Sequence, residues 1–250
     1  MAGSTVVFIS GVSQGIGKAL AQAYLLRPHH IVIGSVRDTN SPNLDDLKAS
    51  PTGEGSKLVF VHIESTSPDD PKKAAEDIKA QGIDHIDVVI ANAGGSPPVV
   101  PLDEVGHKDM ITAFQTNVCG PLGTFQAFKP LLQKSAKPKW VSISSIGSSL
   151  AIMPQMRTDL TPAYGTSKAG LNWITLAIYC ANEWLTTLHL HPGLVQTGPG
   201  NWVAQQIGMD KAPVTIEQSV KNITTLVDEA TREKTSGKLI NSVDGTVMPW

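Results

Sequence analysis

Short, continuous apolar runs alternate along the chain with longer stretches in which apolar residues recur at helical spacing. The apolar runs predict strands at about 5–10, 30–35, 57–63, 86–91, 139–145, 186–191 and 238–241. The stretches between them predict helices at about 15–26, 69–81, 107–133, 164–184 and 215–230. Runs such as Val88-Val89-Ile90 are apolar throughout, which is typical of strands covered by helices on both faces. We therefore expect an α/β fold with a doubly wound parallel sheet of about seven strands.

The length and composition fit one soluble enzyme domain. We expect residues 1–250 to form a single domain, because α/β folds of this size often do. A net charge of −2 gives no electrostatic footprint for nucleic acid, and no apolar run is long enough to cross a membrane. No signal peptide is visible, so a cytoplasmic location is the default expectation. Segments 39–56 and 151–162 are rich in Pro, Ser or Thr and are expected to be loops for part of their length.

A glycine-rich loop, Ser-Gly-Val-Ser-Gln-Gly-Ile-Gly at 10–17, joins the first predicted strand to the first helix. In that context the three glycines allow a tight turn, close approach of the backbone and helix packing, while the free N–H groups at the helix start suit a pyrophosphate. The alternative is a simple turn, since three residues separate the first two glycines where one is commoner. The order of strand, loop and helix indicates a Rossmann-type fold. The cofactor contacts expected from this loop are Gly11, Ser13, Gln14, Gly15, Ile16 and Gly17.

Tyr164 and Lys168 are four residues apart in a predicted helix, so their side chains project from one face. A nearby ammonium stabilises a phenolate and brings the pKa of the tyrosine closer to neutrality, so the pair can exchange a proton with a substrate oxygen. Alone, this spacing is common on solvated helix faces. The motifs around it decide its interpretation.

Five motifs in this order resemble the short-chain dehydrogenase/reductase family, and the resemblance covers essentially the whole chain. They are Ser-Gly-x-x-x-Gly-Ile-Gly at 10–17, Asn92-Ala93-Gly94, Ser145, Tyr164-x-x-x-Lys168 and His191-Pro192-Gly193. Within the family, segments 34–38 and 237–245, with Pro249-Trp250, look like the carbonyl reductases related to C-factor and sniffer and like fungal norsolorinic acid ketoreductases.

The resemblance implies a catalytic set. Tyr164 would give a proton to a carbonyl oxygen as the nicotinamide delivers hydride to the carbon, and Lys168 would lower the pKa of the tyrosine and bind the nicotinamide ribose. Ser145 would hold the substrate oxygen; Ser144 is the rival, because neighbours along a strand face opposite ways, but Ser145 matches the family position. Asn117 matches the asparagine that kinks a central helix and holds a water in a proton relay. Its alternative is a polar helix residue with no catalytic part.

The end of the second strand distinguishes the two dinucleotides. An acidic residue there would bind the ribose hydroxyls of NAD and repel the extra phosphate of NADP, whereas this chain offers Ser35 and Arg37. An arginine pairs with a 2′-phosphate, so we predict NADPH/NADP+ as the cofactor. Two features run against this: Gln14 stands where many relatives carry a basic residue, and Asp38 adjoins Arg37. As an alternative, Arg37 is an ordinary exposed cation.

Further cofactor contacts are implied by the resemblance. Glu64 would lie near the adenine or merely end a strand, and Asn92-Ala93-Gly94 would approach the adenosine ribose or form a turn. The segment after the sixth strand would contact the nicotinamide amide through Pro192, Gly193, Val195 and Thr197. Thr197 could equally cap a short helix.

The substrate is less visible in the sequence. Residues 198–213, with apolar Trp202, Ile207 and Met209, look like a lid, and the long step from Ser145 to Tyr164 places an insertion beside the pocket. An aromatic or aliphatic carbonyl compound would suit these side chains, although such residues belong more often to the core. The expected pocket residues are Ser145, Gly147, Met153 and Trp202.

Together these features predict an NADPH-dependent ketoreductase that acts on a small-molecule carbonyl compound. The alternatives are an NAD-dependent alcohol dehydrogenase working oxidatively and a catalytically silent NADP(H)-sensing protein. Apolar residues around most of the helix at 171–184 predict a homodimer or homotetramer. Cys119 and Cys180 have no paired spacing or histidine cluster, so we predict no metal site and expect both to be small core residues.

Overall fold

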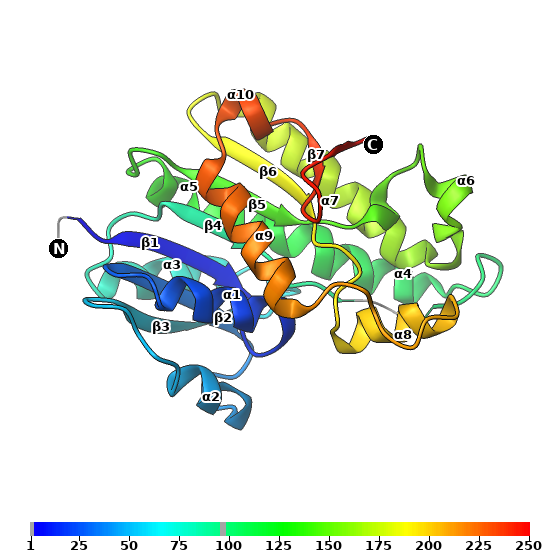
Figure 1. Cartoon of the computed structure of the whole chain (residues 1–250). Coiled ribbons are helices and arrows are strands. Elements are labelled where there is room, and N and C mark those ends of the chain that lie inside the picture. Colours follow the sequence, from blue (N-terminus) through cyan, green and yellow to red (C-terminus); the bar gives the residue numbers. More distant parts are fainter. Residues whose placement is uncertain (1–2, 96–98) are drawn as a thin grey trace.

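The computed structural model describes residues 3–95 and 99–250, and within these ranges the strands form one eight-stranded sheet in the order β3-β2-β1-β4-β5-β6-β7-β8 (Figure 1). All neighbouring strands are parallel except β7 and β8. The strands are β1 (Thr5–Ser10), β2 (His30–Val36), β3 (Lys57–His62), β4 (Val88–Ala91), β5 (Lys139–Ile143), β6 (Thr186–His191), β7 (Leu239–Asn241) and β8 (Val247–Met248). The seven predicted strands are confirmed, and the short antiparallel β8 makes an eighth.

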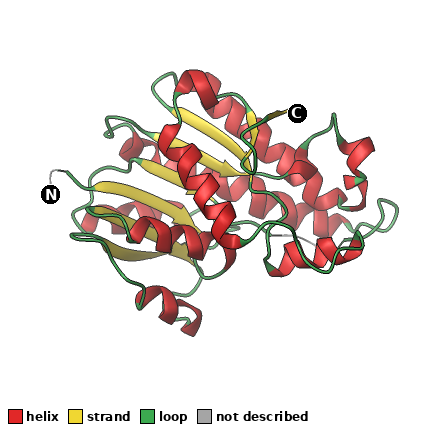
Figure 2. Cartoon of the chain, in the orientation of Figure 1, coloured by secondary structure: helices red, strands yellow, loops and turns green. Residues whose placement is uncertain are grey.

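Helices cover both faces of the sheet (Figure 2). They are α1 (Gly15–Leu25), α2 (Asp45–Lys48), α3 (Asp70–Ala80), α4 (His107–Phe114), α5 (Gly120–Leu132), α6 (Met153–Met156), α7 (Pro162–Ala181), α8 (Gly198–Gln206), α9 (Ile216–Glu229) and α10 (Arg232–Thr235). Shorter 3₁₀ turns are η1 (Pro42–Leu44), η3 (Ile146–Ser148) and η4 (Thr158–Leu160), and η2 (Gln115–Cys119) is a π-helical turn.

Two hydrophobic clusters divide the core between the two faces. On one face, Leu20 of α1 and Ile223 of α9 pack with Val7 and other strand residues. On the other, Ile78 of α3 and Phe128 of α5 belong to the second cluster, and the ring centroids of Phe8 and Phe128 lie 4.6 Å apart. Burying both faces explains why these strands are apolar throughout rather than alternating.

The topology places the site. Strand β1 pairs with β2 on one side and with β4 on the other, so the strand order reverses at β1. In open parallel sheets ligands bind outside the carboxyl ends of the strands at such a reversal. The segments that follow β1, β4, β5 and β6 therefore meet at one edge of the sheet.

Several elements differ from the expectations. The helix expected at 107–133 is divided into α4 and α5 by η2, and the expected loops contain η1, α2 and α6. The prediction of buried cysteines is wrong, because Cys119 and Cys180 are both exposed. Each lies on the solvent side of its helix, close in sequence to the buried residues Val118 and Ile178.

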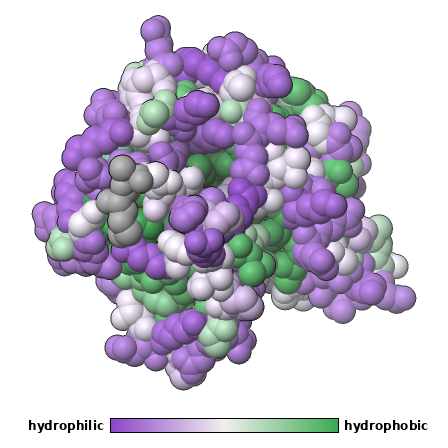
Figure 3. All heavy atoms as spheres, turned by 60° about the vertical axis from the view of Figure 1, so that its left-hand side comes forward, coloured by the Kyte–Doolittle hydropathy of each residue, from purple (hydrophilic) through white to green (hydrophobic). Residues whose placement is uncertain are grey.

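The surface seen from the edge where β1 begins is mainly hydrophilic, with smaller hydrophobic areas in its recesses (Figure 3). Among the described helices, none is both long enough and apolar enough to span a bilayer.

Candidate active site

Ser145 and Tyr164 come together although they belong to different elements. Ser145 is the second residue after β5 and caps η3, where its Oγ accepts the N–H of Gly147 at 3.1 Å. Tyr164 lies in the first turn of α7, which begins at Pro162. Burial raises the pKa of the Tyr164 phenol, and a hydrogen bond with Ser145 acts in the opposite direction. Gly147 lies beside these two residues, because a Cβ added at Gly147 would lie 3.5 Å from Ser145 Oγ.

The two rival serines have different surroundings. Ser144 is buried, and its hydroxyl donates to Asn172 Oδ1 on α7 at 2.6 Å. Asn172 in turn donates to Ser148 Oγ at 2.7 Å, so Ser144 belongs to a network that fixes η3 on α7. Ser145, the next residue along the chain, lies on the side of Tyr164 and acts to lower the pKa of its phenol. The geometry therefore supports the choice of Ser145.

Lys168 lies one turn after Tyr164 and is fully enclosed. Its Nζ donates to the carbonyl oxygen of Ile143 at 2.9 Å and lies 5.7 Å from the centre of the Tyr164 ring. Burial lowers the pKa of Lys168 to about 8. In this structure burial dominates at Tyr164, whose pKa is raised, whereas the resemblance implied a pKa lowered by Lys168. A tyrosine that keeps its proton at neutral pH is suited to act as a proton donor.

Asn117 stands in the middle of the π-helical turn η2 and is completely buried. Its Nδ2 donates to the carbonyl oxygen of Gly95 and to Ser167 Oγ, both at 2.9 Å, and its Oδ1 accepts the N–H of Gly95 at 2.9 Å. The wider π turn thus supplies the amide that joins the loop after β4 to α7. Gly94 fits against this junction, since an added Cβ would lie 3.4 Å from Lys168 Nζ.

The glycine loop has the geometry that its sequence predicts. Gly11 and Gly15 have positive φ angles of 74° and 59°, which side chains rarely adopt. A Cβ at Gly17 would overlap the carbonyl oxygen of Gly11. No side chain of the described residues caps α1, and its first turn holds no acidic residue. The start of α1, with Ile16 and Gly17, therefore keeps N–H groups for an anion, and the loop fits a dinucleotide pyrophosphate.

Serine and asparagine side chains beneath the loop hold it in place. Ser10 Oγ accepts the N–H groups of Asn92 and Ala93 at 3.0 and 2.8 Å, and Asn92 Nδ2 donates to the carbonyl oxygen of Ser10 at 2.9 Å. Ser35 is buried, and its Oγ accepts the N–H of Gly11 at 3.3 Å. Ser35 and Asn92 thus support the loop, and Ser10 is a residue that the sequence reasoning missed. Its signal is a polar residue at the end of a buried strand, beside the loop.

Arg37 is exposed just after β2. The neighbouring Asp38 accepts the N–H of Asn40 at 2.9 Å, so its carboxylate is engaged in a local turn rather than with the guanidinium. Glu64 makes a similar turn, in which its Oε1 accepts the N–H of Thr66 at 3.3 Å. No hydrogen bond or ion pair among the described residues engages the Arg37 guanidinium in the same way.

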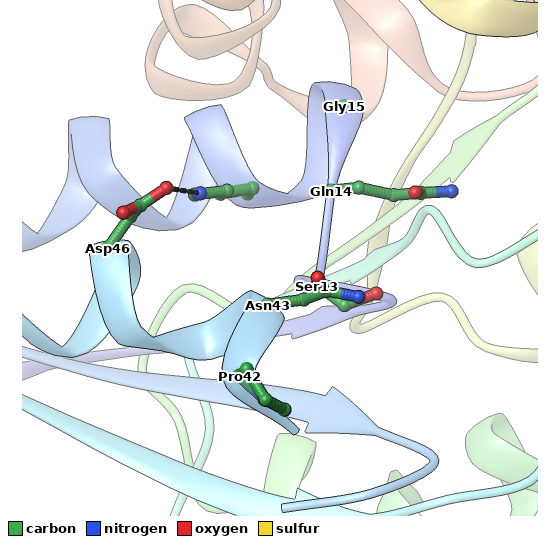
Figure 4. A pocket seen from close by; sticks show the side chains of 7 residues that line it. Ser13, Gln14, Gly15, Pro42, Asn43 and Asp46 are labelled. Atoms are coloured by element: carbon green, nitrogen blue, oxygen red, sulfur yellow. Dashed lines mark hydrogen bonds and ion pairs between the residues drawn. The ribbon is translucent and has the colours of Figure 1, made fainter. Parts of the chain in front are cut away.

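A hollow of about 340 Å³ lies between the glycine loop and η1–α2 (Figure 4). Lys18 borders it and pairs with Asp46 at 2.8 Å, while the side chain of Gln14 points away from Asp46 in this view. Lys18 and Asn43 are further residues of this region that were not predicted. The hollow is lined by Ser13, Gln14, Gly15, Lys18, Pro42, Asn43 and Asp46.

The segment after β6 faces the glycine loop. Gly193 has a positive φ of 86°, and Val195 is buried in an isolated parallel bridge with Val214. Thr197 caps α8 by accepting the N–H of Gly200 at 3.2 Å, and its methyl group would lie 3.7 Å from a Cβ at Gly15. Thr197 is thus both a helix cap and a neighbour of the loop. Pro192 accepts the hydroxyl of Ser219 at 2.9 Å.

Two segments form the side of the site where we expect the substrate: the insertion between Ser145 and Tyr164, and residues 198–213. The bridge between Val195 and Val214 closes the base of the segment at 198–213, which contains α8. Trp202 and Met153 remain 42% and 38% exposed, so neither is a core residue. Figure 1 shows α6 and α8 at the same end of the molecule, beyond the carboxyl ends of the strands.

Comparison with known proteins decides the family. The sequence model described as short chain dehydrogenase matches residues 5–206. The chain belongs to the short chain dehydrogenase family. This family places it among the oxidoreductases, and the Rossmann-type fold agrees.

Curated relatives and solved structures agree over the full length. The short-chain dehydrogenase srdF of Neurospora crassa is 56% identical, over 99% of this chain and 98% of that protein. The norsolorinic acid ketoreductase nor1 of Dothistroma septosporum is 37% identical, over 98% of this chain and 92% of that protein. The NADPH-bound carbonyl reductase from chicken fatty liver is 26% identical and has a TM-score of 0.86, with 99% of both chains covered. The predicted resemblance to carbonyl reductases and norsolorinic acid ketoreductases is confirmed.

Proposed function

We propose that the protein is an NADPH-dependent ketoreductase. The observation that carries this proposal is the junction of Ser145, Tyr164 and Lys168, in which a hydroxyl, a protonated phenol and a buried amine from two elements meet. A protein that only sensed the nucleotide would need the glycine loop but not this acid.

In the proposed reaction, Ser145 donates a hydrogen bond to the substrate carbonyl oxygen and holds it near Tyr164. Bound NADPH supplies a hydride to the carbonyl carbon. Tyr164 gives its proton to the oxygen as negative charge develops there, and the ammonium of Lys168 stabilises the resulting phenolate. Asn117 keeps α7 aligned with the loop after β4 through its bonds to Gly95 and Ser167.

The preference for NADPH over NADH rests on charge at the end of β2. Arg37 is exposed there, and the carboxylate of the neighbouring Asp38 accepts the N–H of Asn40 instead of pairing with the guanidinium. Lys18 is a second cation beside the hollow. We assign to it the role of the basic residue that many relatives carry at the position of Gln14. A phosphate with two cations nearby forms charge-assisted hydrogen bonds that NADH cannot make. Among solved relatives, the chicken carbonyl reductase is described as NADPH-bound.

We assign the substrate to bulky aromatic or aliphatic carbonyl compounds. Trp202, Ile207 and Met209 of the proposed lid at 198–213 are 42%, 62% and 45% exposed, and Met153 follows Gly147 in the insertion. Apolar side chains left open beside a polar reaction centre suit an apolar ligand. The relative nor1 is named a norsolorinic acid ketoreductase, which agrees with a ketone as the substrate.

A homodimer or homotetramer is part of this proposal. Trp173 of α7 is 72% exposed, and Ile111 and Phe114 of α4 are 57% and 47% exposed. A Cβ at Gly170 would lie 3.4 Å from the Phe114 ring, so these apolar side chains belong to one α4–α7 surface. Trp173→Glu should lower the molar mass in light scattering if a second copy covers this surface.

The decisive experiment measures oxidation of NADPH and NADH by the purified protein against aromatic and aliphatic ketones, with Tyr164→Phe as control. The proposal expects turnover that prefers NADPH and is lost in Tyr164→Phe, while nucleotide affinity is retained. Oxidation of alcohols with NAD+ as the preferred reaction would instead identify an alcohol dehydrogenase. Tight NADPH binding together with wild-type turnover in Tyr164→Phe would refute the mechanism.

A further inference from the structure

His191, the last residue of β6, joins three segments at the edge of the active site. Its Nδ1 accepts the N–H of Ile146, the residue directly after Ser145, at 3.1 Å. Its carbonyl oxygen accepts the N–H of Ser242, which follows β7, at 2.9 Å. Its next neighbour, Pro192, begins the segment that faces the glycine loop.

The imidazole takes a position in the sheet that a backbone carbonyl would normally fill. The N–H of Ser144 donates to the carbonyl oxygen of Leu190 at 2.7 Å, which continues the ladder between β5 and β6. The next rung would join the N–H of Ile146 to the carbonyl oxygen of Pro192, two residues further along each strand. That oxygen instead accepts the hydroxyl of Ser219, and Ile146 donates to the side chain of His191.

The other bonds around Ser145 are local and do not attach this turn to β6. Ser145 Oγ accepts the N–H of Gly147, and its carbonyl oxygen accepts the hydroxyl of Ser148 at 2.5 Å. These bonds shape η3, while Asn172 holds Ser148 on the α7 side. The hydrogen bond that the Ile146 N–H donates to His191 attaches this turn to β6, one residue after Ser145.

We propose that His191 is a positioning residue for the reaction: its Nδ1 anchors the peptide that follows Ser145, so that the serine hydroxyl stays directed at the substrate oxygen and Tyr164. This inference rests on the proposed function of Ser145. Accepting a hydrogen bond at Nδ1 requires the neutral ring with its proton on Nε2. Burial lowers the pKa of His191 to about 4, although Asp244 acts in the opposite direction, so the ring is neutral at physiological pH.

Three substitutions at one position separate this role from simple packing. In His191→Asn the amide oxygen can reach the place of Nδ1, in His191→Gln it reaches the place of Nε2, and in His191→Leu no acceptor remains. The readouts are kcat and KM with 9,10-phenanthrenequinone, the Kd of NADPH from fluorescence, and hydrogen exchange of the peptide that contains Ile146. The exchange measurement needs no turnover and reports the bond directly.

We expect His191→Leu and His191→Gln to lower kcat about tenfold, with the NADPH Kd changed less than about twofold and faster exchange at Ile146. His191→Asn should recover most of kcat and of the exchange protection. Added to Ser145→Ala, His191→Leu should cause little further loss, because both changes act on the same hydroxyl.

Wild-type kcat in His191→Leu, or fully additive losses with Ser145→Ala, would overturn the inference. So would equal losses in the Asn and Leu variants accompanied by weaker NADPH binding, because His191 would then act through Pro192 and Gly193. Failure of the proposed function looks different: the wild-type protein would reduce no ketone, while the exchange difference between the Asn and Leu variants would persist.

Discussion

The cofactor side and the substrate side of the active site are built in different ways. On the cofactor side, the backbone is fixed by glycines and by buried hydroxyl and amide groups, as where Ser10 Oγ accepts the N–H groups of Asn92 and Ala93. On the substrate side, large apolar residues such as Leu150, Met156 and Ile207 are 69%, 54% and 62% exposed.

This difference separates what is common to a fold from what belongs to one enzyme. A dinucleotide is bound mainly by backbone geometry, which few residue types permit, so the loop has little freedom to vary. Exposed apolar side chains are constrained by their ligand more than by packing. We therefore expect changes on the cofactor side to alter nucleotide affinity and changes on the substrate side to alter the KM of the ketone.

The largest effect should come from the serine where the two sides meet. Ser145→Ala removes the hydroxyl beside Tyr164 and should lower kcat about 100-fold with an unchanged NADPH Kd. Ser144→Ala is the matched control, because it leaves Asn172 Oδ1 without its donor. The control should lose about 1–3 kcal/mol of unfolding free energy yet keep kcat. If kcat fell more in Ser144→Ala, the assignment of the two serines would be reversed.

The glycine loop should show the next largest effect. A methyl group at Gly17 overlaps the carbonyl oxygen of Gly11, so Gly17→Ala should raise the NADPH Kd about 30-fold or more. Gly198→Ala is the control, since nothing lies within 4 Å of its added Cβ. Isothermal titration of both variants tests this, and equal affinities would show that the loop does not govern binding.

Lys168 should set the alkaline limit of ketone reduction. Burial lowers its pKa to about 8, so the ammonium that stabilises the phenolate is present below that pH and lost above it. The kcat/KM for reduction should therefore fall about fivefold between pH 8 and 9, since this parameter reports the free enzyme. A profile that stays flat to pH 10 would contradict this role for Lys168.

Arg37 should govern the choice of dinucleotide. Arg37→Ala removes the exposed cation after β2 and should lower the ratio of NADPH to NADH affinity about tenfold. Lys18→Ala should change the ratio less, because Lys18 already pairs with Asp46. Loss of affinity for both nucleotides to the same extent would assign Arg37 to general attraction instead.

The smallest effect is expected on the substrate side. Trp202→Ala should raise the KM of a bulky aromatic ketone about threefold to tenfold and leave the NADPH Kd unchanged. Trp184→Ala serves as the control with unchanged KM, because Trp184 is 37% exposed and precedes β6 at the opposite edge of the sheet. Identical KM values in the two variants would remove Trp202 from the pocket.

The hydrophobic pattern was sufficient to predict the seven parallel strands, whereas the set of Ser145, Tyr164 and Lys168 was implied by the family resemblance. The pattern could not reveal β8, because two residues carry no periodicity. The supporting roles of Ser10 and Ser35 were missed because a serine at a strand end has the same appearance whether it binds a ligand or a backbone. The sequence indicates His191 only as part of the motif His191-Pro192-Gly193. Its bond to Ile146 could not be predicted, because the two residues are distant in sequence and the bond depends on where β5 and β6 end.

The π-helical turn at Gln115–Cys119 lets the central helix hold one surplus residue at the position of Asn117. It accommodates one more residue per turn than the helix on either side, and α4 and α5 are both aligned to that surplus. Deleting one residue here would return the turn to ordinary α-helix and keep α4 and α5 in phase, but it would remove the wider turn that carries Asn117 to Gly95 and Ser167. Homologues that keep this junction should therefore have their insertions and deletions in the surrounding loops.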